Sequence, residues 1–401
     1  MFLGVLLIEI FSGLRKKIFI LLSRVPYPLE KGDKLRAYYQ IREMSENHDI
    51  ILCALSDRPI PPEAKEFLQP YTKALYFFRL SRINIFFRLV KNFFSEKPYQ
   101  VAYFFSKNVS RKIQDLIGIH QPDHLFFQLI RTAEYANGIG IDKTLDYQDV
   151  FSKGLERRIN ISPWYKKPLL RQEYLRVVNY EKKAFEAFEK KVIISHPDRD
   201  LIPHEGRDSI EIVPNGVDTH FFHPMDQEKK YDVVFTGNMG YPPNVNAAKY
   251  LVNEIMPLVW KQNPEVTVLL AGANPAPGVK ALASKKVTVT GWVDDIRDYY
   301  AGSKVFIAPM RIGTGLQNKV LEAMAMQLPC ITSALANQAL KAMPDQEVLI
   351  GEEPAQYARH VLSLLNEPGQ RVRLAESGYR FVLRNFHWRN VCSQLEKIII
   401  R

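Results

Sequence analysis

Two glycines and three charged side chains lie close together at the start of an apolar, alanine-rich segment, RIGTGLQNKVLEAMAMQLPCI. Gly313 and Gly315 allow a ligand to approach the backbone closely, because glycine has no side chain. The apolar periodicity that follows predicts a helix, whose first turn offers unpaired N–H groups and the positive end of the helix dipole. Arg311, Lys319 and Glu322 surround this turn. The segment therefore predicts a binding site for an anion.

Alternating strand and helix patterns must position this turn. The segments YDVVFTGNM, EVTVLLAG, VTVTGWV and KVFIAPM are short apolar runs bounded by Gly, Pro and Asn, which is typical of buried strands. In a parallel sheet covered by helices, ligands bind at the carboxyl ends of the strands. The loops GNMGYPPN, GWVDD and RIGTGLQN each follow a strand. We therefore expect these three loops to converge on one site.

A similar succession occupies the first half of the chain. KIFILLSRVPYP, DIILCAL, DHLFFQL, KTLDYQDV and KKVIISHPDRDLI read as strands, and EKGDKLRAYYQIREMSENH reads as a helix. A chain of 401 residues also exceeds what one hydrophobic core normally serves. We predict an α/β protein with two doubly wound Rossmann-like domains that face a cleft, at residues 1–205 and 206–380. We expect a last helix at 381–401 to pack back toward the first domain.

Four loop residues of the first domain are candidates for contact with a second substrate. Gly32, Asp33 and Lys34 follow the first strand and are expected to face the cleft, and Asp149 lies in the loop after TLDYQ. A helix cap or an ordinary loop carboxylate accounts for the two aspartates equally well. Both interpretations stay open at this point.

The net charge limits the kinds of molecule that the protein can bind, and the cysteine content indicates its redox environment. The formal net charge of +11 indicates attraction to an anion: nucleic acid, a phosphorylated small molecule or the inner face of a membrane. The basic residues are spread along the chain and do not gather with an aromatic stacking platform, which argues against nucleic acid. The three cysteines lie far apart in sequence, which argues against a disulfide framework or a zinc site. A reducing, cytoplasmic setting follows.

Two segments have the composition of membrane-contacting sequences. The amino-terminal stretch MFLGVLLIEIFSGL is too short to span a bilayer, and we interpret it as a peripheral helix or an extended start, with a weak anchor as the alternative. The segment RLSRINIFFRLVKNFFSEKPYQ combines phenylalanines with basic residues at helical spacing. It predicts either an amphipathic helix at a membrane interface or a helix packed on the core of the first domain.

Several motifs together carry a resemblance to a known family. EIVPNGVDTHFFHP, VFTGNM, GWVDDIRDYYAGSKVFIAPM and GTGLQNKVLEAMAMQLPCI occur in this order. The string resembles the carboxyl-terminal lobe of retaining glycosyltransferases of family 4, which have the GT-B fold. SRVPYPLEKGDKLRAYYQI and LDYQDVFSK are similar to the sugar transferases of bacterial exopolysaccharide and exosortase systems. The resemblance implies a nucleotide diphosphate sugar as donor, bound mostly on the second lobe.

The resemblance assigns donor-site roles to particular residues. It places the backbone N–H groups of Gly315 and Leu316 at the phosphates, and a carboxylate at Glu322 on the ribose hydroxyls. A plain surface pair between Lys319 and Glu322 is the alternative for that carboxylate. The backbone of Val293 matches the position that contacts the base. The remaining donor-binding candidates are Gly237 and Asn238 in the loop GNMGYPPN, and Gly313 and Thr314 in the loop RIGTGLQN.

The sequence also departs from the family pattern. Members usually carry two glutamates that lie eight positions apart. Glu322 matches the later of the two, and the position of the earlier one is Thr314 here. An arginine that usually follows the glycine of the VVFTG strand is replaced by Asn238. A departing diphosphate still needs cations to compensate its charge, so we assign Arg311 and Lys319 to this catalytic role. No DxD-type motif occurs in a suitable loop, and we expect transfer without a metal or other cofactor.

These observations favour a retaining, nucleotide-sugar-dependent glycosyltransferase. We expect its acceptor to be a glycan or a lipid-linked sugar of a cell-surface polysaccharide or glycolipid, and its location to be cytoplasmic, with peripheral contact at the inner face of the membrane. A sugar-nucleotide epimerase of the same fold is one alternative. A noncatalytic nucleotide-sugar-binding or scaffold protein is the other, because the carboxylate is missing at Thr314.

Overall fold

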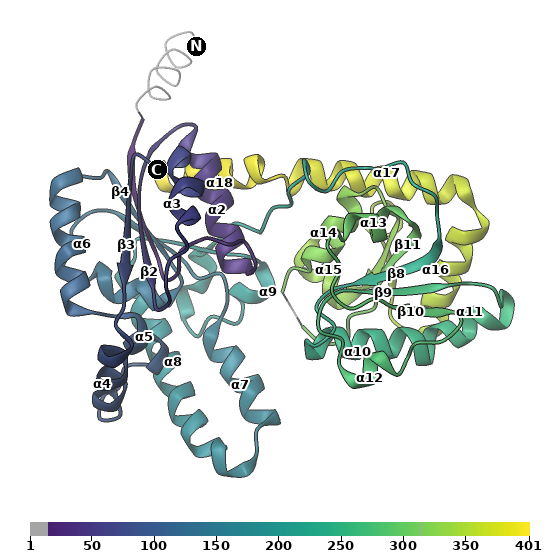
Figure 1. The fold of residues 1–401 in the computed structure, drawn as a ribbon, viewed down its shortest axis with the longest axis horizontal. Coiled ribbons are helices and arrows are strands. Elements are labelled where there is room, and N and C mark those ends of the chain that lie inside the picture. Colours follow the sequence, from purple (N-terminus) through teal and green to yellow (C-terminus); the bar gives the residue numbers. More distant parts are fainter. Residues whose placement is uncertain (1–14, 314) are drawn as a thin grey trace, which may run out of the picture. The chain divides into compact units, whose positions relative to one another are not determined.

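The computed structural model describes residues 15–313 and 315–401, and these divide into two compact units (Figure 1). The first unit comprises the described residues up to Ile194, together with Asp198–Val213 and Cys392–Arg401. The second comprises Ser195–Pro197 and Pro214–Val391. The interpretations offered for the amino-terminal stretch 1–14 and for Thr314 lie outside the described residues.

The first unit is built on a parallel sheet with the strand order β3-β2-β1-β4-β5-β6-β7. The apolar runs of the sequence form its centre: all of β1 after its first residue and all of β4 are buried. The first six strands have the order 3-2-1-4-5-6 of a Rossmann fold, in which the chain changes direction between β1 and β4. The strands are β1 (Lys17–Leu22), β2 (Asp49–Ser56), β3 (Ala74–Arg79), β4 (His124–Gln128), β5 (Lys143–Asp146), β6 (Lys190–Ile193) and β7 (Glu211–Ile212).

Helices connect these strands, and two of them, α7 and α8, form an arm that extends from the first unit (Figure 1). A short 3₁₀ turn at Trp164–Lys166 separates these two helices. The helices of this half of the chain are α2 (Gly32–Ser45), α3 (Glu63–Leu68), α4 (Arg82–Asn92), α5 (Tyr99–Phe104), α6 (Lys107–His120), α7 (Phe151–Ile161), α8 (Lys167–Ala187) and α9 (His196–Arg199). Further 3₁₀ turns lie at Gln69–Tyr71, Ile130–Ala136 and Glu205–Ser209.

A buried ion pair fixes α2 on the sheet of the first unit. Arg36 Nε donates to Asp146 Oδ2 over 2.7 Å, and both side chains are at most 1% exposed. Arg36 Nη2 also donates to the carbonyl of Val213 over 2.9 Å, and Gln40 donates to the same carboxylate over 3.1 Å. The carboxylate at the end of β5 is therefore neutralised by α2 within the protein.

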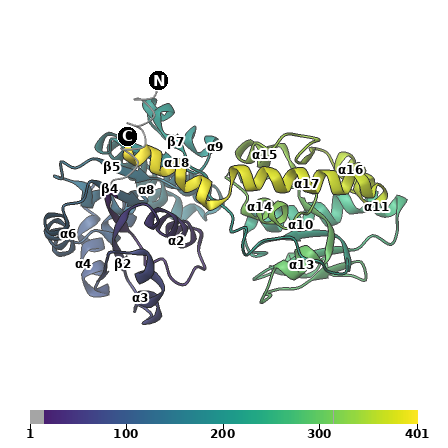
Figure 2. The same cartoon turned by 90° about the horizontal axis from the view of Figure 1, so that it is seen from above.

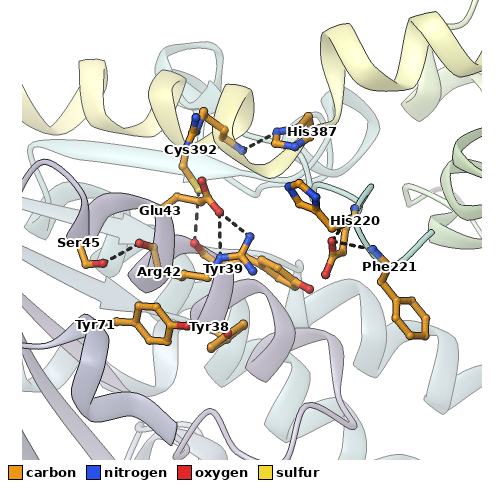
Figure 3. A network of polar contacts seen from close by, with 12 residues as sticks. Tyr38, Tyr39, Arg42, Glu43, Ser45, Tyr71, His220, Phe221, His387 and Cys392 are labelled. Carbon is orange, nitrogen blue, oxygen red and sulfur yellow. Dashed lines mark hydrogen bonds and ion pairs between the residues drawn. The ribbon is translucent and has the colours of Figure 1, made fainter. Parts of the chain in front are cut away.

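Three cysteines are buried in separate parts of the fold. Burial raises the pKa of the thiols of Cys53, Cys330 and Cys392. The Cys392 thiol lies 3.8 Å from the carbonyl of Tyr39, and Figure 3 shows it beside α2, near the ion pair of Arg42 with Glu43. These thiols serve as small apolar core groups.

The second unit repeats the same topology with the order β10-β9-β8-β11-β12-β13, in which neighbouring strands are parallel. This order is again 3-2-1-4-5-6. Its strands are β8 (Tyr231–Thr236), β9 (Val268–Ala271), β10 (Val287–Val289), β11 (Ser303–Ala308), β12 (Cys330–Ser333) and β13 (Leu349–Gly351). Both sheets confirm the predicted α/β class with two doubly wound sheets.

The helices of the second unit cover both faces of its sheet, as the view from above shows (Figure 2). A π-turn at Leu251–Ile255 joins two helices into one long element. The helices are α10 (Pro242–Tyr250), α11 (Met256–Gln262), α12 (Pro277–Lys280), α13 (Arg297–Ala301), α14 (Asn318–Ala325), α15 (Ala334–Leu340), α16 (Pro354–Asn366) and α17 (Pro368–Asn385). The last helix, α18 (Trp388–Ile400), begins in the second unit and ends in the first.

Candidate nucleotide site

A pocket of about 570 Å³ opens in the second unit at the carboxyl ends of its strands. It lies beside β8, where the chain changes direction within the sheet, which is the usual ligand position in this topology. The first turn of α14 closes one side. The pocket is lined by Phe221, Thr236, Gly237, Asn238, Tyr241, Asn244, Gly272, Ala273, Trp292, Val293, Asp294, Ile296, Leu316, Gln317, Asn318, Lys319 and Glu322.

Two glycines bring the loops after β8 and β9 into close contact. Gly237 and Gly272 have φ angles of +144° and +139°, which side-chain-bearing residues rarely adopt. A Cβ on Gly272 would lie 1.9 Å from the Gly237 carbonyl oxygen, and a Cβ on Gly237 would lie 2.8 Å from the Asn244 amide nitrogen. Only glycine therefore allows these two loops to form the rear wall of the pocket.

Glu322 lies in the pocket wall on α14 and is held by a buried tyrosine. Tyr300 Oη donates to Glu322 Oε2 over 2.8 Å, and the same hydroxyl lies 2.7 Å from Thr236 Oγ1. Burial raises the pKa of the Glu322 carboxyl, while the Tyr300 hydrogen bond and the charge of Lys319 lower it. The carboxylate is thus oriented by groups from α13 and β8 before any ligand arrives.

Lys319 lies one helical turn before Glu322 and does not form the surface pair with it that was considered as an alternative. Its ammonium donates to Asn244 Oδ1 and lies 5.1 Å from the centre of the Phe235 ring. The Asn244 amide in turn donates to the Asn238 carbonyl over 2.9 Å. Burial lowers the pKa of Lys319 to about 8, although the Glu322 carboxylate opposes this shift. A half-buried ammonium with so few polar partners is well suited to bind an anion.

Three aromatic side chains at the pocket rim are exposed, and the sequence interpretation did not select any of them. Trp292 is 77% exposed, Tyr241 55% and Phe221 42%. An Asx-type contact holds Phe221, whose N–H donates to Asp218 Oδ1 over 3.1 Å, and Figure 3 shows its ring pointing away from this turn. Exposed flat rings beside a polar pocket are suited to stacking on a planar base. Two of these residues could have been selected from the sequence, because Trp292 lies in the loop GWVDD and Tyr241 lies in the loop GNMGYPPN.

Six of the residues predicted for donor binding or catalysis line this pocket: Gly237, Asn238, Val293, Leu316, Lys319 and Glu322. Gly313 and Gly315 belong to the same turn but are not among the lining residues. Gly313 has a φ of +101°, and the Gly315 carbonyl accepts from the Gln317 amide over 2.9 Å. The turn therefore depends on glycine at position 313.

The structure places Arg311 outside the pocket lining. Its guanidinium lies 4.7 Å from the centre of the Tyr250 ring and 3.5 Å from Glu254 Oε1. The side chain is 54% exposed, so nothing in the fold fixes it there strongly. Its assignment to the departing diphosphate stays a prediction.

The four acceptor-side candidates of the first unit have local structural partners. Gly32 is the first residue of α2, and Asp33 accepts from Arg24 over 2.7 Å. Lys34 donates to the Tyr27 carbonyl over 2.9 Å and lines a separate small pocket of about 240 Å³. Asp149 is exposed in the loop after β5. Lys34 is thus the candidate that contributes to the lining of this small pocket.

Across residues 15–313 and 315–401, no three His, Cys, Asp or Glu side chains gather in a way that could hold a metal ion. Over the same ranges, none of the helices has both the length and the apolar composition needed to cross a membrane.

The part of the chain that contains this pocket is similar to a known protein family. Residues 230–367, which contain all but one of the pocket-lining residues, match the family described as glycosyl transferases group 1. An uncharacterized 44.6 kDa protein in the cps region of Klebsiella pneumoniae is 23% identical over 95% of this chain and 99% of its own length.

Two solved structures share the fold across almost the whole chain. Sucrose-phosphate synthase from Thermosynechococcus elongatus superposes with a TM-score of 0.67, at 13% identity, covering 96% of this chain and 98% of its own. The Anabaena protein Alr3699/HepE, in complex with UDP and glucose, has a TM-score of 0.64 at 12% identity, covering 94% and 98%. The matched domain and the shared fold together support a glycosyltransferase of the GT-B fold.

Proposed function

We propose that this protein is a retaining glycosyltransferase that moves a sugar from a nucleotide diphosphate sugar to a glycan or lipid-linked acceptor. The observation that carries the proposal is the Glu322 carboxylate, which Tyr300 orients in the wall of a pocket that also contains Lys319. We assign Glu322 Oε1 to a ribose hydroxyl, since Tyr300 occupies Oε2. The exposed ring of Trp292 and the backbone of Val293 then receive the base.

The diphosphate in this proposal lies against the first turn of α14. The backbone N–H groups of Gly315 and Leu316 and the ammonium of Lys319 provide positive charge there. The binding of UDP by the Anabaena structure and the group 1 match of residues 230–367 support this placement. The same match favours a transferase over an epimerase of similar fold.

The proposed chemistry needs no protein nucleophile. The acceptor hydroxyl attacks the anomeric carbon from the face that the diphosphate leaves, the bond from that carbon to the diphosphate oxygen breaks, and the hydroxyl proton passes to the departing oxygen. Lys319 and Arg311 compensate the charge that develops on the diphosphate, which is the role a metal ion has in other enzymes. Arg311 must leave Tyr250 and Glu254 to reach it. We propose that the acceptor belongs to a cell-surface polysaccharide or glycolipid made at the cytoplasmic face of the membrane.

A binding experiment tests the donor site directly. Titration calorimetry with UDP, GDP and ADP, on wild type and Glu322→Ala, is expected to show one nucleotide that binds wild type and loses at least tenfold in affinity in the variant. Glu376→Ala, which removes a half-exposed carboxylate on α17, is the matched control and should bind as wild type does. Equal binding by Glu322→Ala and wild type would refute the donor site. Binding without transfer to any acceptor would favour the noncatalytic alternative.

A further inference from the structure

Exposed apolar side chains are concentrated at one end of the first unit. Eighteen large apolar residues are exposed in the described part of the chain, and ten of them lie within residues 83–94 or 164–175. Phe94 is 91% exposed and Trp164 is 81% exposed. The others are Ile83, Phe86, Phe87, Val90, Phe93, Tyr165, Leu169 and Leu175. Single exposed apolar residues are ordinary, but a concentration of this kind marks an interaction surface.

Helix α4 has apolar residues on both of its faces. Ile85 is buried, Leu89 packs against the core of the first unit, and Arg88 Nη2 donates to the Tyr103 carbonyl over 3.1 Å. This face attaches the helix to the protein. The opposite face presents Phe86 and Phe87, which are 62% and 64% exposed. The core-packed helix and the amphipathic surface helix that the sequence left open are therefore two faces of one element.

The arm formed by α7 and α8 lies beside this helix. Arg176 Nη2 on α8 donates to the Phe93 carbonyl over 3.0 Å, and the Tyr99 N–H donates to Glu173 over 2.7 Å. Figure 1 shows α4 and the tip of the arm at the same end of the first unit. We call residues 82–94 and 157–175 together the arm surface.

The charges of the arm surface have one sign over most of its length. The segments 82–94 and 157–171 contain no aspartate or glutamate. Exposed basic side chains accompany the aromatic ones. The basic residues of the two segments are Arg82, Arg88, Lys91, Arg157, Arg158, Lys166, Lys167 and Arg171. A second copy of the same surface would bring like charges together, so charge complementarity favours an anionic partner.

An apolar groove of about 440 Å³ opens along the arm and continues this surface. Leu169 contributes both to the exposed cluster and to the groove lining, where it lies with Leu155, Leu170 and Phe151. Aromatic and aliphatic groups bordered by lysine and arginine match the interface of a bilayer, in which apolar chains lie beneath charged headgroups. The groove gives an acyl chain of such a bilayer a place to enter.

We propose that the arm surface binds an anionic lipid bilayer, with the aromatic side chains inserted between headgroups and the basic side chains on lipid phosphates. This surface belongs to the first unit alone and stands whether or not the second unit transfers sugar. The proposal specifies which residues make the contact and which lipid charge they select.

Vesicle sedimentation tests the proposal with the full-length protein. The vesicles contain either phosphatidylcholine alone or phosphatidylcholine with 30% phosphatidylglycerol. Wild type is expected to bind the anionic vesicles at least tenfold more tightly than the neutral ones, and more weakly as salt rises. The variant Phe87→Ser/Phe94→Ser/Trp164→Ser should lose at least tenfold in binding to anionic vesicles. The matched control Ile119→Ser/Met343→Ser/Val372→Ser removes three side chains exposed elsewhere, and should bind as wild type does.

A thermal melt of each variant first establishes that it is folded. Equal vesicle binding by the two triple variants, equal binding of wild type to neutral and anionic vesicles, or no binding at all would overturn the proposal. So would a wild-type dimer in sedimentation equilibrium that only the arm-surface variant dissociates, since the occupant would then be a second copy. Because nucleotide binding by the second unit is measured separately, the absence of vesicle binding would not count against the proposed donor site.

Discussion

The ammonium of Lys319 has a pKa of about 8, and this value gives the donor site a pH dependence. Below pH 8 the side chain is charged and attracts a diphosphate. As the pH rises through about 8, free protein loses this proton, whereas the bound diphosphate favours its retention, so affinity falls. We expect the affinity for the cognate nucleoside diphosphate to fall about tenfold between pH 7 and pH 9.

Titration calorimetry at several pH values measures this dependence. Lys319→Met should bind more weakly at pH 7 and show an almost flat profile, because the titrating group is gone. If the wild-type and variant profiles fall in parallel, another group controls the pH dependence and Lys319 does not contact the diphosphate.

Arg311 provides a second prediction for a single side chain. Its contacts with Tyr250 and Glu254 are exposed, and such pairs contribute less than about 1 kcal/mol to stability. Arg311→Ala should therefore leave the free energy of unfolding almost unchanged in urea titrations. If Arg311 compensates the departing diphosphate, the same change should lower kcat on the order of 100-fold. Glu254→Ala, which releases Arg311 without removing it, should keep wild-type turnover, and full activity of Arg311→Ala would exclude the assignment.

Among the elements, the attachment of α2 to the first sheet depends on one buried pair. Arg36→Met leaves the Asp146 carboxylate buried with only neutral partners, and we expect it to lower the free energy of unfolding by about 3–5 kcal/mol. Arg42→Met changes an arginine on the same helix that is 28% exposed in its pair with Glu43, and should cost less than Arg36→Met does. Urea denaturation measures the loss in both variants. A loss below about 1 kcal/mol for Arg36→Met would show that the helix is held by its apolar face alone.

Most elements could be predicted from the sequence, and the exceptions have physical reasons. β8, β9 and β11 are apolar runs bounded by loop residues, so their pattern is clear. β12 was not predicted, because Cys330–Ser333 has only four residues and follows the apolar segment of α14 after a short interval. β13 has only three residues, Leu349–Gly351, which is too short for any alternation to be recognised.

The candidate site was predictable only where a motif marks it. Glu322 and Lys319 lie in a recognisable turn, and both line the pocket. Asn244 and Tyr300, which hold these two side chains, were not found, because each partner comes from a different helix and the contact exists only after the sheet brings the helices together. Arg311 illustrates the opposite case, since its proximity in sequence did not bring it into the pocket lining.

At the scale of the whole chain, each unit has its own hydrophobic core. One buried cluster extends from Phe19 to Ile210 and the other from Val217 to Phe386. Proteins with separate cores commonly unfold in more than one step. A ligand stabilises the part that binds it, by about 2.7 kcal/mol at 100 times its Kd.

We therefore expect two transitions in differential scanning calorimetry. The cognate nucleotide should raise the midpoint temperature of only the transition that belongs to the second unit. Glu322→Ala should remove this shift and leave the other transition in place. A single transition whose van't Hoff and calorimetric enthalpies agree, and which moves as a whole, would show instead that the units unfold together.

The burial of all three native cysteines has a practical consequence for labelling. Maleimides react with thiolates that solvent can reach, and Cys53, Cys330 and Cys392 offer neither access nor an ionised sulfur near neutral pH. A cysteine introduced on the surface is therefore the one that a dye modifies, with no need to remove the native three. In the variant Phe94→Cys, the fluorescence of an environment-sensitive dye would report directly when the arm surface makes a contact. The same dye on Ile119→Cys would give the reference signal.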